Sequence, residues 1–539
     1  MIASVFSASA RRTGAGLLAC WLLLLALAAV RPLALPDEGR YAEISRWMLV
    51  SGDWLVPRLD GLPFFHKPPL LHWLQAGAMA LLGVHPWVVR LVPALAAGLM
   101  LAGLLAAARR LAGEGIARRA AWMLAASAGF LLGGQYANHD MLVAAWIASA
   151  IWCFALAFLQ ADAAGRPHAG WARAGFAACA LGVMTKGLIG LLLPGLVLLL
   201  WIGATRRWRQ LPRLPWAGGL ALFAAIAVPW FVLAAQRYPG LWAYQFGVQQ
   251  FGRFTGRSFN NPEPWWFHLA VLALLMFPWS FLLPFGRPVA VAKVHAAIRN
   301  IANETILLCW IWLLALLLFF SIPHSKLIGY ILPTLPPTAL LAAAGWERLA
   351  AGRPRAARAF PAAVALALAG SVAFSFGFAR HVNDKLSGAA ARALACRAAP
   401  GEPVYLAPGT GYPHDLPFIA QTDAPLRVVQ DWPRLRGQVR DDWRRELLDA
   451  AAFEPAQAAA LLLTPPALAA AANLPRRWLL TSPPGPRETH PLPPPPPGWR
   501  RVWQDAQWTL WQSAPEGPEA AQHERLPGCD DEGDDQRRP

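Results

Sequence analysis

Long runs of apolar residues constrain the fold of this chain more than any other feature. Two examples are GAGLLACWLLLLALAAV (residues 14–30) and ETILLCWIWLLALLLFF (residues 304–320). A helix of about 20 apolar residues can span a bilayer because it satisfies its own backbone hydrogen bonds. The whole chain is 56% hydrophobic and only 15% charged, which is more apolar and less charged than an ordinary soluble domain. We therefore predict a polytopic α-helical membrane protein.

The apolar runs predict about eleven membrane spans. We place them near 14–33, 88–108, 119–135, 141–161, 170–185, 187–204, 216–236, 265–285, 303–321, 327–345 and 359–380. The first run also resembles a signal peptide, but further spans follow and we expect it to remain as an uncleaved helix.

The net charge of +17 reflects membrane topology and contact with anionic lipid, not a nucleic-acid partner. Basic residues collect in alternate connections between the predicted spans, and this positive-inside pattern marks those connections as cytoplasmic. These residues are Arg11, Arg12, Arg109, Arg110, Arg118, Arg119, Arg166, Arg173, Arg206, Arg207, Arg209, Arg213, Arg287, Lys293, Arg299, Arg348, Arg353, Arg355 and Arg358.

We divide the chain into three regions. Residues 1–380 form a membrane body with an amphipathic first outer loop at 34–87, where Trp47 and Trp54 lie at the level of the lipid headgroups. Short β-like runs and a helical stretch at 441–452 predict a small α/β domain at 381–512, which the topology places in the periplasm of a Gram-negative cell. The acidic, polar segment 513–539 is predicted to be disordered. Cys396 and Cys529 lie outside the membrane, but we do not predict a disulfide between them, because it would tie the C-terminal tail to a helix.

Unusual polar residues gather in the connections that this topology places outside. Charges on one side of the membrane boundary, carried by short loops, indicate a shared outward-facing site. They include Asp37, Glu38, Arg40, Tyr41, His66, Lys67, Asn138, His139, Asp140, Lys186, Arg253, Arg257, His324, Ser325, Lys326 and Tyr330.

Each of these residues also has a purely structural interpretation. Asp37 and Asp140 stand where a helix begins, and an acid there can simply cap the helix. Lys67 precedes two prolines and can belong to a turn, although a rigidly held lysine also suits a phosphate. A single Lys or Arg at a helix end often extends its charged group to the membrane–water interface without binding a ligand. The convergence of several such residues favours a site.

Six segments, in this order, resemble the GT-C superfamily of polyprenyl-phosphate-sugar glycosyltransferases. They are PDEGRYAEI, PFFHKPPLLHWL, the aspartate of NHDML, TKG, PWWF and SKLIGYILP. The closest similarity is to lipid A aminoarabinose transferases, with protein O-mannosyltransferases more distant. It covers roughly residues 14–345 and, weakly, the outer domain.

The resemblance implies eleven to thirteen helices and transfer of a sugar, with inversion, from undecaprenyl phosphate to an acceptor at the outer leaflet. It implies that Asp37 and Asp140 are catalytic acids of the site. Arg40, Tyr41 and Lys67 would lie near the donor phosphate, and Lys186 and Tyr330 would line the same cavity. We assign Glu38, His66, Arg253, Arg257 and Lys326 to substrate binding as well. The expected partners are the lipid-linked donor, a lipid A or other glycolipid or glycan acceptor and membrane lipids, and we expect a monomer in the bacterial inner membrane.

Two positions depart from the pattern of the family. His66 replaces the usual glutamate before Lys67, and Asn260 and Asn261 stand where a histidine is common. Those positions can hold a metal in relatives, so we expect neither a bound divalent cation nor another cofactor here.

The sequence leaves the role of Asp37 open. It can accept a proton if the acceptor is a hydroxyl, or it can orient basic groups if the acceptor is a phosphate. The sugar and the acceptor are also open. Two other classes remain as alternatives, a transporter or flippase of lipid-linked sugars and a non-catalytic relative. A transporter would require ionisable groups deep in the spans and repeated halves, and neither is evident in the sequence.

Overall fold

The computed structural model describes residues 8–252, 254, 256, 261–287, 296–382, 386–409, 411–435, 441–470, 476–483 and 494–513. Its contacts divide the chain into two compact units. Unit 1 comprises Met1–Arg31, His66–Leu74 and Trp87–Ala379, and unit 2 comprises Pro32–Phe65, Gln75–Pro86 and Arg380–Pro539.

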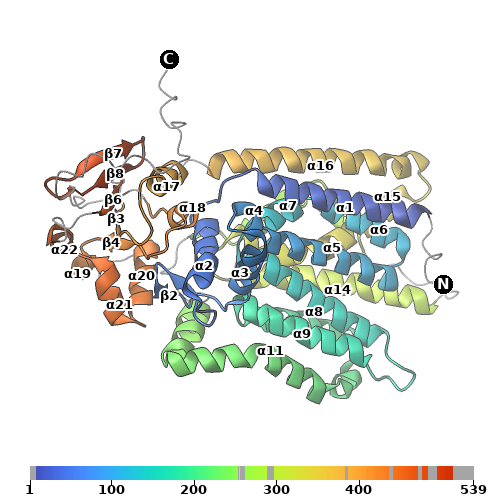
Figure 1. Ribbon diagram of the computed structural model, residues 1–539. Coiled ribbons are helices and arrows are strands. Elements are labelled where there is room, and N and C mark those ends of the chain that lie inside the picture. Colours follow the sequence, from blue (N-terminus) through green and yellow to red (C-terminus); the bar gives the residue numbers. More distant parts are fainter. Residues whose placement is uncertain are drawn as a thin grey trace. The chain divides into compact units, whose positions relative to one another are not determined.

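Unit 1 is a bundle of apolar helices, which confirms the predicted fold class (Figure 1). Seven helical stretches among the described residues are long and apolar enough to cross a membrane, or eight if one bent pair counts as a span. The helices of these seven stretches are α1 (Ala8–Ala29), α4 (Pro86–Val89) with α5 (Leu91–Leu111), α8 (His139–Leu159), α11 (Trp216–Arg237), α14 (Ala296–Ser321), η5 (Ile328–Thr334) with α15 (Leu335–Ala350), and α16 (Pro354–Val382).

Helix α8 forms the centre of the bundle. It packs against α5, α9 (Ala169–Lys186) and α10 (Ile189–Thr205), and 78% of its apolar window is buried. A span surrounded by other helices does not contact lipid, and this explains why it is apolar on every side. Helix α16 lies at the other extreme, since only 22% of its window is buried.

Two of the predicted spans are not single straight helices. The segment 119–135 divides into α6 (Glu114–Ala125) and α7 (Ala128–Gln135), because the Ser127 side chain caps the new helix by accepting from the Phe130 amide. The segment 265–285 forms α13 (Phe267–Leu275) and η3 (Trp279–Phe285), which meet at 107°. Pro278 precedes η3 and has no amide hydrogen to continue a helix.

Unit 2 contains a six-stranded sheet in the order β5-β4-β3-β6-β8-β7 (Figure 1). Four neighbouring strands of this sheet run parallel to one another. They are β3 (Val404–Ala407), β4 (Arg427–Val429), β5 (Leu462–Leu463) and β6 (Trp478–Thr481). Strands β7 (Arg500–Gln504) and β8 (Thr509–Gln512) form an antiparallel hairpin.

Short helices connect these strands, as expected of an α/β unit. They are α17 (Gly388–Ala395), α18 (Leu416–Ala420), α19 (Trp432–Leu435), α20 (Trp443–Ala451), α21 (Pro455–Leu461) and α22 (Pro465–Ala470). The strands form within the region 381–512 where short β-like runs predicted them, and α20 falls within the predicted stretch 441–452. The predicted disordered tail lies outside the described residues, apart from Ser513.

The first outer loop contributes to the core of unit 2. Its elements are α2 (Asp37–Ser51), β1 (Arg58–Leu59), β2 (Leu62–Pro63) and the apolar helix α3 (Leu70–Leu82), whose second part belongs to this unit. Ile44, Leu59 and Phe64 pack in one hydrophobic cluster with residues of the sheet such as Leu406 and Val428. A helix, α2, therefore forms at the start of the predicted first outer loop. Trp47 is only 9% exposed, whereas Trp54 is 42% exposed, and their position at the level of the lipid headgroups stays a prediction.

The cysteines are described for five of their six positions. Cys20, Cys153, Cys179 and Cys309 are free and lie within the helices of unit 1. Cys396 is disulfide-bonded, although the sequence did not lead us to predict a disulfide. Cys529 lies outside the described residues.

Candidate functional site

A pocket in unit 1 brings together six of the residues that the sequence singled out. His66 and Lys67 precede α3, Asp140 lies in the first turn of α8, Lys186 ends α9, Ser325 precedes η5 and Tyr330 lies in η5. The pocket has a volume of about 130 Å³. Segments that are far apart in the chain thus meet at one place, as the sequence predicted.

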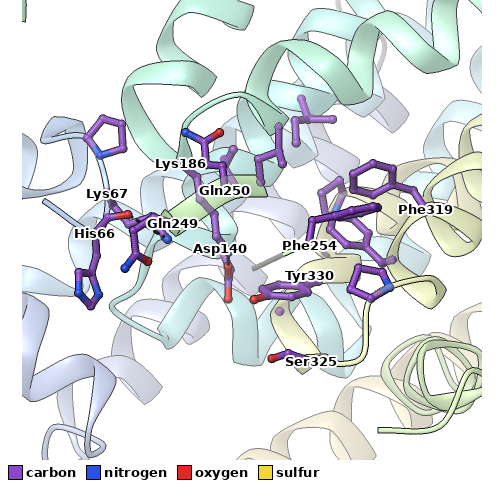
Figure 2. A pocket seen from close by; sticks show the side chains of 18 of the residues that line it. His66, Lys67, Asp140, Lys186, Gln249, Gln250, Phe254, Phe319, Ser325 and Tyr330 are labelled. Carbon is purple, nitrogen blue, oxygen red and sulfur yellow. Dashed lines mark hydrogen bonds and ion pairs between the residues drawn. The ribbon is translucent and has the colours of Figure 1, made fainter. Parts of the chain in front are cut away.

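Asp140 and Lys186 form an ion pair at the centre of this pocket (Figure 2). The carboxylate is almost buried, at 6% exposed. Its second oxygen accepts from the Asn138 side-chain amide at 2.9 Å, while the Asn138 side-chain oxygen caps the amide of Asp140 at 2.9 Å. Asp140 is therefore held by both neighbours, and the capping function that the sequence allowed for Asp140 belongs to Asn138 instead.

Tyr330 and Gly329 complete the surroundings of this ion pair. The Lys186 ammonium lies 4.7 Å from the centre of the Tyr330 ring, close enough for a cation–π interaction. A Cβ atom at position 329 would lie 2.0 Å from the second carboxylate oxygen of Asp140. Only glycine leaves room there for the carboxylate.

The pocket has a polar side and an aromatic side. In Figure 2, His66, Lys67 and Gln249 lie on one side, and Phe254 and Phe319 lie together on the other. Lys67 donates to the carbonyl of His66 at 3.1 Å. Two lysines against one carboxylate leave the lining with net positive charge, which favours an anion that carries an apolar group.

Part of the pocket lining comes from a segment that was not predicted from the sequence. The π-helical segment η2 (Ala243–Gly252) supplies Gln245, Gln249 and Gln250. The Gln250 side-chain oxygen accepts from the Leu188 amide at 2.7 Å and so joins η2 to the turn that follows Lys186. The adjacent pair Gln249–Gln250 beside the predicted Arg253 was a signal that could have identified this segment.

Lys326 is placed differently from the other predicted residues of unit 1. Its ammonium donates to the carbonyls of Glu263 at 2.7 Å and Pro323 at 2.6 Å, and its side chain does not line the described pocket. Burial lowers the pKa of Lys326, and the Glu263 carboxylate opposes this effect. These contacts fasten the segment before η5 to the bridge between Pro262 and Ser325.

The remaining predicted residues of the first loop belong to unit 2. Arg40 donates to Asp37 at 2.5 Å and also pairs with Glu446 of α20. Burial acts to lower the pKa of Arg40, but the carboxylates of Glu446 and Asp37 raise it above its ordinary value. The guanidinium therefore stays charged and ties α2 to α20.

Glu38 and Tyr41 also have contacts within unit 2. The Glu38 carboxylate is fully buried and accepts from the Ala34 amide at 2.7 Å. Tyr41 packs against the hydrophobic cluster, and Arg40 lies 5.0 Å from the centre of its ring. A Cβ atom on Gly39 would lie 2.8 Å from the amide nitrogen of Asp415, so the glycine allows α2 to pack directly on the backbone of the domain.

A second buried group lies next to α2. The Tyr412 hydroxyl donates to Asp60 in the β1–β2 turn. Burial raises the pKa of Asp60 to about 7, while the hydrogen bond from Tyr412 opposes the rise. Burial and the charge of Arg40 lower the pKa of His414. Neither Glu446 nor this group was predicted, because no local pattern links residues about 400 positions apart.

Two predicted binding residues lie outside the part of the chain that the structure describes. They are Arg253 and Arg257, and Asn260 lies outside it as well. Within the described ranges, no three His, Cys, Asp or Glu side chains lie close enough together to hold a metal ion.

The comparisons with known proteins agree with the resemblance stated above. The family model of dolichyl-phosphate-mannose-protein mannosyltransferases matches residues 14–245. A Pseudomonas aeruginosa protein named undecaprenyl phosphate-alpha-4-amino-4-deoxy-L-arabinose arabinosyl transferase is 37% identical over 337 residues, covering 60% of this chain and 58% of the relative. A Pseudomonas savastanoi protein of the same name is 38% identical, covering 64% of each chain. The chain thus spans less than two thirds of the length of these curated relatives.

A solved structure matches over a longer part of the chain. It is ArnT from Cupriavidus metallidurans bound to undecaprenyl phosphate, with a TM-score of 0.75 and 25% identity. The match covers 94% of this chain and 98% of that one.

Proposed function

Because the chain is a member of the GT-C glycosyltransferase superfamily, we propose that it is an inverting transferase in the bacterial inner membrane. It moves a sugar from an undecaprenyl-phosphate carrier to lipid A or another envelope acceptor. The observation that supports this most is the pocket in which Lys67, Lys186 and Asp140 meet beside an aromatic wall.

The charges of the pocket suit the leaving group of such a reaction. The acceptor oxygen attacks the anomeric carbon, the bond from that carbon to the phosphate oxygen breaks, and its electron pair stays on the phosphate. Lys67 and Lys186 stabilise the growing negative charge there. Asp140 keeps the Lys186 ammonium in place, and the aromatic side chains receive the first part of the prenyl chain.

Asp37 is the acid that we propose for the acceptor side. If the acceptor is a hydroxyl, the Asp37 carboxylate takes its proton. If the acceptor is a phosphate of lipid A, no base is required, and Asp37 instead holds Arg40 toward the anionic groups. In both cases Glu446 acts through Arg40 as a positioning residue.

The names of the relatives identify the donor to test first, undecaprenyl phosphate 4-amino-4-deoxy-L-arabinose. The purified full chain, given this donor and lipid A, should yield lipid A heavier by one aminoarabinose and release undecaprenyl phosphate. Lys186→Ala should lower the rate about 10²-fold, since the loss of one such group from a preorganised site has this effect. The control is Arg166→Gln, which changes an exposed residue that pairs with Asp162 and does not line the described pocket.

Three outcomes separate the candidate functions. Release of undecaprenyl phosphate without modified lipid A indicates a different acceptor. Movement of the intact donor across vesicle membranes without release indicates a transporter. No release from any synthetic polyprenyl-phosphate sugar contradicts the transferase proposal.

We also propose a topology and an oligomeric state. The C-terminal α/β region faces the periplasm, and the chain acts as a monomer. Single cysteines introduced at exposed positions of that region, in a variant without native cysteines, should react with an impermeant thiol reagent in intact spheroplasts. A cysteine at Arg209, on a predicted cytoplasmic connection, should react only after lysis.

A further inference from the structure

A second pocket in unit 1 lies at helix ends that carry arginine. It has a volume of about 450 Å³ and is lined by Arg12 and Thr13 of α1, by Arg118, Arg119 and Trp122 of α6, and by Ala357, Phe360 and Pro361 of α16. None of these residues contributes to the pocket around Asp140 and Lys186. The sequence places these arginines on the cytoplasmic side by the positive-inside pattern.

The walls of this pocket are aromatic. A Cβ atom on Gly16 would lie 2.5 Å from the Trp122 ring, so Trp122 packs directly on α1 and closes the space between α1 and α6. Phe360 lies 5.4 Å from Trp346 between ring centres, and the Arg119 guanidinium lies 5.8 Å from the centre of the Phe360 ring. The Trp122 and Phe360 rings thus place apolar surface beside the arginines, which lowers the local dielectric and strengthens their attraction for a bound anion.

The charge of the pocket is positive. The Arg119 guanidinium pairs with Glu347, and Arg12 and Arg118 line the same pocket. The described lining thus holds three guanidiniums and no carboxylate. A guanidinium binds phosphate oxygens in a bidentate manner, and two or three of them suit phosphate groups better than a carboxylate.

Two of the helices that frame the pocket are little buried within the protein. Only 33% of the apolar window of α1 and 22% of that of α16 is buried. Leu18 and Leu22 on α1 are 54% and 51% exposed, and Leu366 on α16 is 77% exposed. A ligand with acyl chains can therefore place its chains along these helices while its headgroup lies among the arginines.

We propose that this pocket binds the headgroup of an anionic phospholipid, and that a lipid with two phosphates, of the diphosphatidylglycerol type, fits it best. Basic pockets between membrane helices on the cytoplasmic side are a known means of holding such headgroups. The three guanidiniums and the volume of about 450 Å³ accommodate two phosphates. The bound lipid bridges α1, α6 and α16 and so stabilises a helix that otherwise packs loosely.

The test is native mass spectrometry of the purified full chain with diphosphatidylglycerol and phosphatidylcholine in equal amounts. The unmodified protein should retain diphosphatidylglycerol preferentially. The double variant Arg12→Gln/Arg118→Gln should weaken its binding about tenfold to thirtyfold, since each basic residue near an anionic lipid surface contributes about 1 kcal/mol. Ala357→Glu adds a carboxylate to the pocket from an exposed position. It should also weaken the binding of diphosphatidylglycerol.

The matched control is Arg166→Gln/Arg209→Gln, which removes the same charge from exposed residues outside the pocket. Retention of diphosphatidylglycerol by this control within about twofold of the unmodified protein supports the site. An equal loss in control and pocket variants shows general surface attraction and overturns the proposal. Competition by inorganic phosphate at the same concentration as the lipid overturns it as well, because the ligand is then a soluble anion.

Discussion

The pocket of unit 1 and the first-loop cluster of unit 2 both contain acid–base pairs, but their surroundings differ. In unit 1, Lys186 pairs with Asp140 and lies beside an aromatic-lined cavity. In unit 2, Arg40 lies between two carboxylates, Asp37 and Glu446, and is only 8% exposed. A cation that borders a cavity can change partner when an anion enters, whereas one enclosed by carboxylates mainly fixes the chain around it.

Further ion pairs in unit 2 support this distinction. Arg46 forms two bonds of 2.7 Å with Glu43 and donates to the Thr422 carbonyl at 2.7 Å. Arg58 donates to both oxygens of Glu454 at 2.8 Å. Arg40, Arg46 and Arg58 of the first loop thus each bond directly to a residue of the C-terminal region. We infer that these residues hold α2 and the β1–β2 turn in the register that presents Asp37.

The largest loss of sugar transfer should come from a substitution of Asp37, which lies at the exposed end of the cluster of Asp37, Arg40 and Glu446. The Asp37 side chain is 29% exposed, more than that of Arg40 or Glu446. Asp37→Asn still accepts from Arg40, so the fold should persist. Sugar transfer should fall about 10³-fold, because the neutral amide can neither take a proton from a hydroxyl acceptor nor hold the Arg40 guanidinium by its charge when the acceptor is a phosphate. Transfer to lipid A and the melting temperature should both be measured, with Asp162→Asn as the control. Unchanged transfer in Asp37→Asn would remove Asp37 from the site.

The next effect concerns the pocket of unit 1. In Gly329→Ala the new methyl group must displace the Asp140 carboxylate, and misplacement of a site by about 1 Å can lower a rate about 10²-fold. We expect a loss of that size with little change in melting temperature. Gly370→Ala is the matched control, because a Cβ atom there meets nothing within 4 Å. Equal activities of the two variants would show that the position of Asp140 does not matter.

A smaller effect should follow from opening the cluster of unit 2. Glu446→Ala leaves Arg40 with Asp37 alone in a mostly buried place, which should lower the free energy of unfolding by about 2 kcal/mol. Chemical unfolding of unit 2, followed by tryptophan fluorescence, measures this change. Glu114→Ala, which removes the partner of Arg109 from a more exposed pair, should change stability by less than about 0.5 kcal/mol. A similar value for both variants would contradict the proposed role of Arg40 as a tie.

The smallest effect is a dependence on pH. The pKa of Asp60 is raised to about 7 in the folded chain, so between about pH 4 and 7 the folded state binds more protons at this site than the unfolded state. The contribution of Asp60 to stability therefore decreases as pH rises through this window. Asp60→Asn still accepts from Tyr412 and should raise the melting temperature at pH 8 relative to the unmodified chain. A melting profile with the same slope in both proteins would contradict the buried, protonated carboxyl.

The membrane body was largely predictable, because apolar runs and arginine-rich connections follow directly from the chemistry of the bilayer. The convergence of Lys67, Asp140 and Lys186 was predictable for the same reason, since residues at the same ends of spans share one side. The breaks at Ser127 and Pro278 were not predicted, because they depend on a helix cap and a turn that form in the folded chain.

The partners of the first loop were not predictable from the sequence. The motif around Asp37 and Arg40 was visible, but Glu446 lies 406 residues after Arg40, and α20 carries no pattern that distinguishes it from a surface helix. Lys326 shows the opposite difficulty. It follows the pattern of a site residue, yet its ammonium is bonded to backbone carbonyls.

The most direct test of the account is the affinity of the purified chain for undecaprenyl phosphate compared with undecaprenol, which lacks the phosphate. The pocket of unit 1 predicts tighter binding of the phosphate, and a loss of about tenfold or more in Lys67→Ala, because a hydrogen bond to a charged group contributes about 1.5–3 kcal/mol. The affinity of the variant for undecaprenol should not change. Equal binding of the two lipids by the unmodified chain, or unchanged binding of the phosphate by Lys67→Ala, would contradict the account.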